Sequence, residues 1–317
     1  GALPEGAFQF LAGSVTGLLD FCGPQDTVGF TGSARTGNLI RGNAHLLANN
    51  VRVNVEADSI NSAVLGPDVE VDEDTFTQFV TNVHVDMTQK AGQKCTAVRR
   101  ILVPAALLDD VREALVERLE ATKVGNVMDD AVRMGPVASA AQHEDVLSGI
   151  GQLQAVADTI TGGAKIEGPG YFVQPTLLQA RDNHAEVLHD LEVFGPCATL
   201  LPYDGDAVTA VDLVNRAGGC LVSSVYSDDK RWVTELVGGI APWHGRVWVG
   251  SEKTMGQALG PGACLPAAIH GGPGRAGGGE ELGGMRGLMP YLQRTAVQGD
   301  RSVVGRAFGA DAESSAS

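Results

Sequence analysis

Short β-rich segments alternate with longer amphipathic segments along most of the chain, and this alternation constrains the fold most. Residues 51–56 (VRVNVE) alternate apolar and polar side chains as a strand does, whereas apolar residues recur at helical spacing in 76–87. Strands are predicted at 27–32, 51–56, 62–66, 98–103, 171–178, 196–203 and 221–227, and helices at 33–39, 76–87, 109–122, 138–156, 206–216 and 228–237. Strands separated by helices predict an α/β fold with a largely parallel sheet.

The composition argues against several classes of function. With 317 residues, of which 44% are hydrophobic, the chain can bury a large core and can hold two domains. Its net charge of −15 argues against nucleic acid and against an anionic membrane surface as partners. No apolar run approaches the roughly 20 residues that a membrane-spanning helix needs.

Cysteine and histidine usage narrows the chemistry further. The five cysteines are odd in number, scattered and without a CxxC pair, which favours reduced thiols in a cytoplasm over a disulfide framework. The seven histidines show no HExxH or similar ligand spacing, so no metal site is predicted. The chain also lacks a GxSxG elbow, which argues against a serine hydrolase.

One cysteine lies in a loop between a predicted helix and a predicted strand. Residues 86–104 (DMTQKAGQKCTAVRRILVP) end the helix, turn at Gly92, present Cys95 and enter an apolar strand. A thiol in a loop between two rigid elements is well placed to meet a substrate. The alternative is a small buried hydrophobic residue, which is what most free cysteines are.

A second candidate site is the turn that follows the first predicted strand. Residues 27–37 are typical of a strand, a tight glycine turn and a helix start, with Ser33 as the N-cap. Such a turn favours anions because unpaired N–H groups point outward. It lacks the GxGxxG dinucleotide fingerprint, so an ordinary strand-to-helix turn is the alternative.

Three ordered motifs resemble the aldehyde dehydrogenase superfamily. GQKCTAVRRILVP (92–104) resembles its catalytic-cysteine segment, FTGSARTG (30–37) resembles the glycine turn beside its cofactor, and EVFGP (192–196) resembles the segment that holds the nicotinamide ribose. The resemblance covers about residues 1–299. It implies an aldehyde dehydrogenase-like α/β fold, with a parallel-sheet catalytic domain plus part of a Rossmann-like cofactor domain, and a sequence that is N-terminally incomplete relative to the family.

The resemblance also implies the roles of individual residues. Cys95 would form a thiohemiacetal with an aldehyde, and Glu56, in EADSIN, would activate the water that hydrolyses the resulting thioester. The alternative for Glu56 is a solvated carboxylate at a strand end. A free cysteine has a pKa of about 8.5, so the site must stabilise the thiolate or supply a base. The positions expected beside the cofactor are Gly32, Ser33, Gly37, Glu192 and Phe194.

A glycine-rich run narrows the resemblance to one branch. HGGPGRAGGGEELGG (270–284), with YLQRTAVQG (291–299), is similar to the phenylacetate-degradation and dehydroadipyl-CoA semialdehyde dehydrogenases. That branch implies a CoA-linked semialdehyde substrate, NADP with NAD as the alternative, a homo-oligomer, and a fused or separate hydratase. A general aliphatic or aromatic aldehyde dehydrogenase and a non-catalytic fragment are the other interpretations. For the glycine run itself, a flexible surface loop is the alternative.

We expect four parts along the chain. Residues 1–62 would be the C-terminal part of the dinucleotide-binding domain, and 63–262 the catalytic domain that carries the cysteine. Residues 263–300 would form a terminal segment specific to the branch. The small and polar residues of 301–317 predict a disordered tail.

Overall fold

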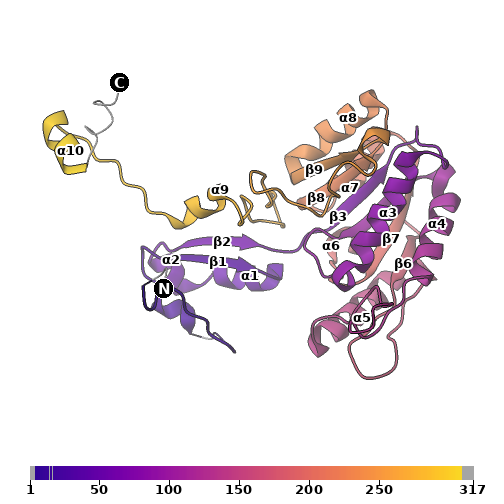
Figure 1. The fold of residues 1–317 in the computed structure, drawn as a ribbon, viewed down its shortest axis with the longest axis horizontal. Coiled ribbons are helices and arrows are strands. Elements are labelled where there is room, and N and C mark those ends of the chain that lie inside the picture. Colours follow the sequence, from indigo (N-terminus) through magenta and orange to yellow (C-terminus); the bar gives the residue numbers. More distant parts are fainter. Residues whose placement is uncertain (1–3, 14, 16, 309–317) are drawn as a thin grey trace.

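The chain forms two separate β-sheets, one small and one large. The structure is a computed structural model that describes residues 4–13, 15 and 17–308. The small sheet is a parallel pair that carries two helices, and its elements are β1 (Thr27–Thr31), α1 (Ala34–Arg41), α2 (Ala44–Ala48) and β2 (Arg52–Glu56). The strands of the large sheet are β3 (Asn61–Leu65), β4 (Val98–Pro104), β5 (Ala157–Thr161), β6 (Thr176–Ala180), β7 (Cys197–Tyr203), β8 (Cys220–Tyr226) and β9 (His244–Gly250). Figure 1 shows the two sheets on opposite sides of the molecule.

The large sheet confirms the predicted α/β class. Its strand order is β5-β6-β7-β4-β3-β8-β9, and each neighbouring pair is parallel except β5 and β6. The helices that connect its strands are α3 (Asp74–Thr88), α4 (Leu108–Glu120), α5 (Ala140–Gln154), α6 (Val187–Asp190), α7 (Ala207–Asn215) and α8 (Lys230–Ile240). Crossover helices of this kind bring consecutive strands into the same direction.

Helices cover both faces of the large sheet, so its central strands β3, β4 and β8 are buried on both faces. In β3, Ala63 and Leu65 pack in a cluster with α3 and α4, whereas Val64 packs in a second cluster with α5, α7 and α8. Successive side chains of a strand point to opposite faces, so one strand supplies both cores. None of the helices in the part of the chain that the structure describes is both long and apolar enough to cross a membrane.

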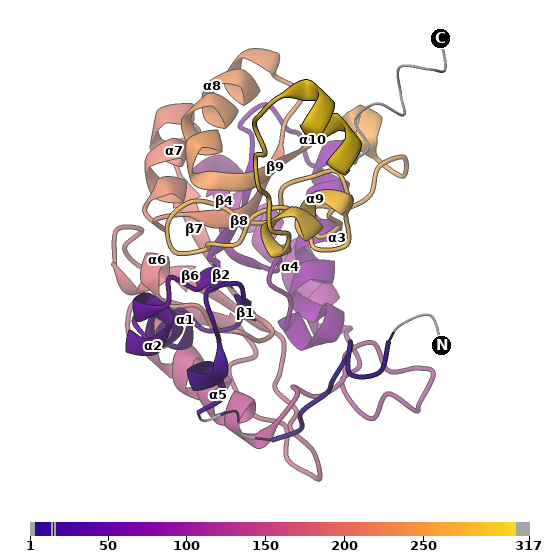
Figure 2. The ribbon, with the colours of Figure 1, turned by 90° about the vertical axis from the view of Figure 1, so that its left-hand side faces the viewer.

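The segment after β9 returns to the small sheet. It contains the 3-10 turn Glu252–Thr254, a glycine-rich hairpin, α9 (Met285–Leu288), the 3-10 turn Met289–Tyr291 and finally α10 (Arg301–Phe308). The Ala57 N–H donates to the Ala276 carbonyl at 2.8 Å, and Glu56 and Gly277 form an antiparallel bridge. Figures 1 and 2 show this yellow segment beside β2, and Figure 1 shows α10 standing away from both sheets.

The structure corrects three details of the sequence analysis. The N-cap of α8 is Asp229 and not Asp228, because the Asp229 carboxylate accepts from the backbone N–H groups of the first turn. Residues 301–308 form α10, although we expected disorder from 301 onward; residues 309–317 lie outside the described residues. The change from the small to the large sheet falls between Glu56 and Asn61, so a domain boundary at 62 would cut β3.

Candidate active site

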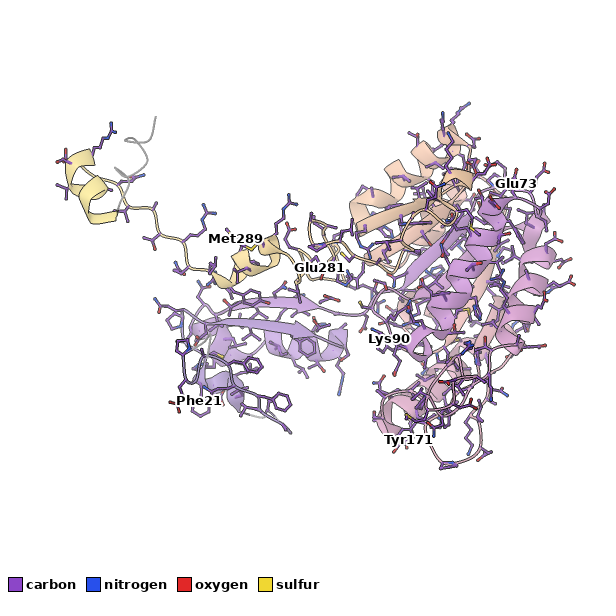
Figure 3. The ribbon with its side chains drawn as sticks, viewed as in Figure 1. Phe21, Glu73, Lys90, Tyr171, Glu281 and Met289 are labelled. Carbon is purple, nitrogen blue, oxygen red and sulfur yellow. The ribbon has the colours of Figure 1, made fainter. Side chains whose placement is uncertain are left out.

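A cavity of about 1050 Å³ lies where the small sheet meets the large one. Its wall comes from the β1–α1 turn, the end of β2, the loop before β4, helix α5 and the segment before β7. Figure 3 places Lys90, at the start of the loop before β4, near the junction of the two sheets. The cavity wall contains six of the seven predicted site positions, namely Gly32, Ser33, Glu56, Cys95, Glu192 and Phe194.

The seventh predicted position, Gly37, lies outside the cavity wall. It is buried in α1, where an added Cβ would come within 2.6 Å of the Val55 side chain. A glycine at this point lets α1 pack closely on β2, which is a structural reason for the residue. Gly37 is not among the described residues that line the cavity.

The turn after β1 starts a helix at Ser33 as the sequence predicts, but the Asp58 carboxylate already accepts from one of its N–H groups. Ser33 is the N-cap of α1, since its hydroxyl accepts from the Thr36 N–H at 3.3 Å. The next backbone N–H, that of Ala34, donates to the Asp58 carboxylate at 2.9 Å. Asp58 also lines the cavity and pairs with Arg275 at 3.4 Å. The acidic group reduces the attraction of this turn for another anion.

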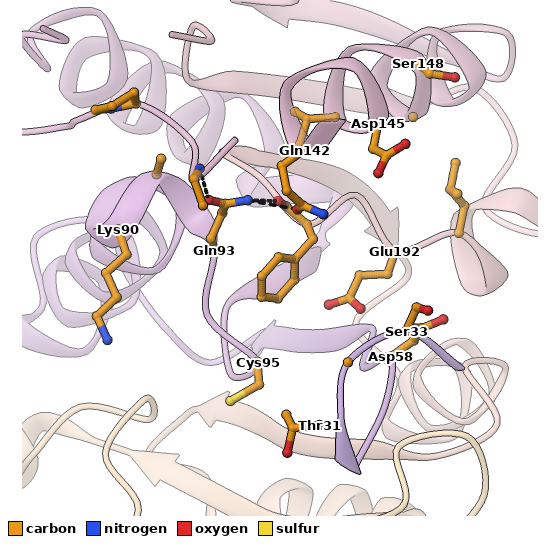
Figure 4. A pocket seen from close by; sticks show the side chains of 18 of the residues that line it. Thr31, Ser33, Asp58, Lys90, Gln93, Cys95, Gln142, Asp145, Ser148 and Glu192 are labelled. Atoms are coloured by element: carbon orange, nitrogen blue, oxygen red, sulfur yellow. Dashed lines mark hydrogen bonds between the residues drawn. The ribbon is translucent and has the colours of Figure 1, made fainter. Parts of the chain in front are cut away.

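The loop that carries Cys95 holds an unusual backbone conformation. Lys90, Ala91 and Gly92 follow one another with φ angles of 55°, 53° and 68°, in the left-handed region. Non-glycine residues in that region are strained and persist only where the surroundings hold them. At Gly92 an added Cβ would come within 2.2 Å of the Gly195 carbonyl oxygen, so only glycine fits there. The tight turn places Cys95 on the cavity wall (Figure 4).

A buried arginine ties the cysteine loop to the segment before β7. The Arg99 guanidinium donates to the Gly195 carbonyl at 2.9 Å and to the Gly92 carbonyl at 3.0 Å. It also lies 3.5 Å from a Glu192 carboxylate oxygen and 5.5 Å from the centre of the Phe194 ring. Two motifs that are far apart in the sequence are thus joined by one side chain.

Glu192 lines the cavity with a carboxylate that is only partly satisfied. One oxygen accepts from the Ser59 N–H at 3.3 Å, whereas the other, Oε1, is buried and lies 3.5 Å from the Arg99 guanidinium without forming a hydrogen bond among the described residues. Burial raises the pKa of Glu192 to about 7, although the positive charge of Arg99 opposes the shift. Figure 4 shows this carboxylate pointing into the space between Cys95 and Asp58.

The structure adds a third group beside Cys95 and Glu56. The His270 Nε2 atom lies 3.4 Å from the Cys95 sulfur and 3.3 Å from a Glu56 carboxylate oxygen. The three side chains place one sulfur, one nitrogen and one oxygen within 4.8 Å of one another. Sequence spacing predicted no metal site, yet the fold collects atoms of the types that bind zinc. Both contacts of His270 use its Nε2 atom. Besides binding a metal, a nitrogen placed in this way can transfer a proton between Cys95 and Glu56.

Sequence reasoning missed His270, Arg99 and also Asn61, which hydrogen-bonds to the cysteine loop. Arg99 lies within the cysteine motif itself, so the motif contained a signal that its side chain had a role. His270 opens the glycine-rich run that narrowed the resemblance, and the oddity of that run was the available signal. The first part of the run is a hairpin, with bridges between Ile269 and Glu280 and between Gly272 and Gly277. An added Cβ at Gly271 would come within 2.0 Å of the Gly279 nitrogen, because the two strands of a hairpin touch there.

The family is established by comparison with known proteins. Residues 2–297 match the aldehyde dehydrogenase family, and the chain belongs to that family. The 3,4-dehydroadipyl-CoA semialdehyde dehydrogenase of Aromatoleum evansii is 42% identical over 281 residues, which cover 86% of this chain and 54% of the relative. Protein MaoC of Klebsiella aerogenes is 38% identical over 174 residues, which cover 54% of this chain and 52% of the relative.

Solved structures show the same fold. The betaine aldehyde dehydrogenase of Staphylococcus aureus in complex with NAD+ superposes with a TM-score of 0.76 at 28% identity. The superposition covers 89% of this chain and 53% of that one. The chain thus spans about half the length of the curated relatives it matches.

Proposed function

We propose that the complete protein oxidises an aldehyde to a carboxylic acid with NAD(P), by covalent catalysis at Cys95. The observation that carries the proposal is the convergence of the Cys95 sulfur and the Glu56 carboxylate, within 4.8 Å, on the wall of one large cavity. A nucleophile and a base at this separation can act on the same carbon atom.

Each chemical step has a residue that can perform it. The Cys95 sulfur attacks the aldehyde carbon, so a C–S bond forms and the carbonyl oxygen becomes an oxyanion that needs fixed donors. The Cys95 backbone N–H is one candidate donor. Loss of hydride from the same carbon leaves a thioester on Cys95. Glu56 then takes a proton from water, whose oxygen attacks the thioester carbon; the C–S bond breaks and the acid leaves.

The cavity also fits a nicotinamide cofactor, which would supply the hydride acceptor. Glu192 Oε1 lies 3.5 Å from Arg99 but is buried without a hydrogen bond among the described residues, and a ribose hydroxyl is a suitable donor for it. Phe194, which is 36% exposed, leaves an apolar ring on the cavity wall for a flat heteroaromatic ring. We propose NADP as the cofactor because of the resemblance to the semialdehyde dehydrogenase branch, with NAD as the alternative.

The substrate, partners and location rest on the same resemblance. We propose a CoA-linked semialdehyde from aromatic-compound degradation such as phenylacetate catabolism, since the relative at 42% identity is named for a CoA-linked semialdehyde. We propose in addition a cytoplasmic homo-oligomer that works with a fused or separate hydratase. A general aldehyde dehydrogenase and a non-catalytic fragment that keeps only the fold are the competing interpretations.

The test compares two substrates in the complete enzyme. A CoA-linked semialdehyde and the free aldehyde of equal chain length are each oxidised with NADP and with NAD, and kcat/KM is measured. A clear preference for the CoA-linked compound supports the branch, whereas equal values favour a general enzyme.

A labelling control then addresses the non-catalytic interpretation. Iodoacetamide should label Cys95 faster than Cys22 and Cys264, which have similar partial exposure. Uniform slow labelling would support the fragment that keeps only the fold.

A further inference from the structure

One nitrogen atom of His270 faces both reacting side chains. Its Nε2 lies 3.4 Å from the Cys95 sulfur and 3.3 Å from a Glu56 oxygen. A ring nitrogen carries either one proton or one lone pair, so it cannot bond both neighbours in the same way at once. It can take a proton from one neighbour and donate the same proton to the other, which is the behaviour of a proton carrier.

The position of His270 is built by the glycine-rich hairpin. The His270 N–H and the Gly271 N–H both donate to the Gly279 carbonyl, at 2.9 and 2.7 Å. The hairpin is locked to the small sheet through the bridge between Gly277 and Glu56. The backbone of Glu56 and the ring of His270 are thus held by the same hairpin. Their side chains are 11% and 13% exposed, so water competes little for the contacts between them.

We propose that His270 is a further catalytic residue, which takes the proton from the Cys95 thiol and holds it between the Cys95 thiolate and the Glu56 carboxylate. In this step the S–H bond breaks and an Nε2–H bond forms, and no electron is gained or lost. The imidazolium then faces the sulfur again when hydrolysis of the thioester releases the thiolate. The place of this step in aldehyde oxidation rests on the proposed function; the activation of Cys95 does not.

The groups around His270 favour its charged form. Contacts with Cys95 and then with Glu56 raise the pKa of His270 to about 10, against the effect of burial. Cys264 and Glu281 each place an atom within 4.8 Å of a His270 ring nitrogen. His270 Nδ1 is buried without a hydrogen-bond partner among the described residues. Against the effect of burial, hydrogen bonds from Gly283 and Cys264 and the charges of His270 and Arg246 lower the pKa of Glu281, and the ionised carboxylate favours an imidazolium.

The test measures the reactivity of Cys95 in the complete enzyme, without aldehyde. Wild type, His270→Gln and His270→Asn are treated with iodoacetamide from pH 6 to pH 9, with EDTA present so that stray zinc does not occupy the three atoms. Peptide masses give the labelling rate of each cysteine. His184→Gln is the matched control, since His184 is an exposed histidine in the loop before α6. Cys22 reports general reactivity in each sample, and the buried Cys197 reports folding because it stays unlabelled in the native state.

The expected result is specific to Cys95. At pH 7 both His270 variants should label Cys95 at least about tenfold more slowly, because an ordinary cysteine is only a few per cent thiolate there. Labelling of Cys95 in wild type should vary little from pH 6 to pH 9, and His184→Gln should behave as wild type. Labelling of Cys95 within twofold of wild type in both variants would overturn the proposal. If neither variant folds, a wild-type rate that rises with pH like that of an ordinary thiol would overturn it too.

The result for His270 is separable from the proposed function. Slow labelling in the variants with no aldehyde oxidation in wild type would keep the role of His270 in activating the thiol and reject the proposed function. Normal aldehyde oxidation by the wild type, together with unchanged labelling of Cys95 in both variants, would support the proposed function and reject the role of His270.

Discussion

Asn61 holds Cys95 in position by donating two hydrogen bonds to the chain around it. The Asn61 side-chain nitrogen donates to the Cys95 carbonyl at 2.8 Å and to the Ala97 carbonyl at 2.9 Å. Its oxygen accepts from the Ser59 hydroxyl at 2.6 Å and the Val222 N–H at 3.2 Å. Asn61 is 2% exposed and opens β3, so the cysteine loop is tied to the centre of the large sheet.

Replacing Asn61 by Ala should displace the cysteine loop. Two carbonyl groups, one hydroxyl group and one N–H group would lose this partner. Each buried unsatisfied group costs about 1–3 kcal/mol. We expect a lower free energy of unfolding, and slower labelling of Cys95 per folded molecule, measured by denaturant unfolding and by alkylation. Asn215→Ala is the control, because Asn215 donates to the Gly239 carbonyl away from the site. Equal labelling of Cys95 in the two variants would show that Asn61 does not position it.

Gly92→Ala should be among the most damaging single-methyl changes in this chain. The alanine would have to keep a φ of 68° and would place its Cβ 2.2 Å from the Gly195 oxygen. Left-handed backbone and overpacking each cost about 1–3 kcal/mol, so we expect a loss of about 2–4 kcal/mol in unfolding free energy. Gly151→Ala is the matched control: Gly151 lies in α5 with no atom within 4 Å of an added Cβ. That variant should gain about 0.5–1 kcal/mol, and equal effects in urea unfolding would contradict the prediction.

Glu56→Gln should separate the two chemical steps. The amide keeps the size of the side chain but cannot take a proton from water, and general-base catalysis contributes about 10²–10⁴-fold. In the complete enzyme we expect a burst of reduced cofactor near one equivalent per site, followed by very slow turnover. Stopped-flow absorbance and intact mass would show the burst and the acyl group on Cys95. A normal burst with normal turnover would mean that Glu56 is only a strand-end carboxylate.

Glu192 should make cofactor binding depend on pH near neutrality. Its pKa, raised to about 7, means that the free protein below pH 7 binds a proton there. A ribose hydroxyl that donates to Glu192 favours the ionised carboxylate, so binding should release this proton and tighten as pH rises from 6 to 8. Calorimetry in buffers of different ionisation enthalpy measures the release. NAD is the ligand for this test, because the extra phosphate of NADP itself titrates near a pH of about 6. In Glu192→Gln the pH dependence of NAD binding should vanish. If it persists, a group other than Glu192 releases the proton.

Local patterns predicted most elements of this fold, although they missed α2, β5, α6 and β9. Ser33 caps α1 and the apolar spacing of 76–87 lies within α3, because a cap and a helical face are formed by residues a few positions apart. The β-rich run after Cys95 forms β4 for the same reason. The cysteine, the Glu192 segment and the glycine turn could be identified from short motifs. At the start of α8 we predicted Asp228 as the N-cap, and this prediction is wrong because Asp229 has that role. The Asp228 carboxylate accepts a hydrogen bond from the Thr75 hydroxyl of α3 instead.

Contacts across the fold were decided only by tertiary structure. Cys95 and His270 are 175 positions apart, and their contact depends on where the chain after β9 returns to the small sheet. Arg99 joins the cysteine loop to Glu192 only because β4 and β7 are neighbours in the large sheet. Neither periodicity nor motif spacing predicts which strands become neighbours, because the packing of both helical layers sets the strand order. The sequence by itself therefore determined the fold class and the cysteine, whereas the tertiary structure decided which side chains surround it.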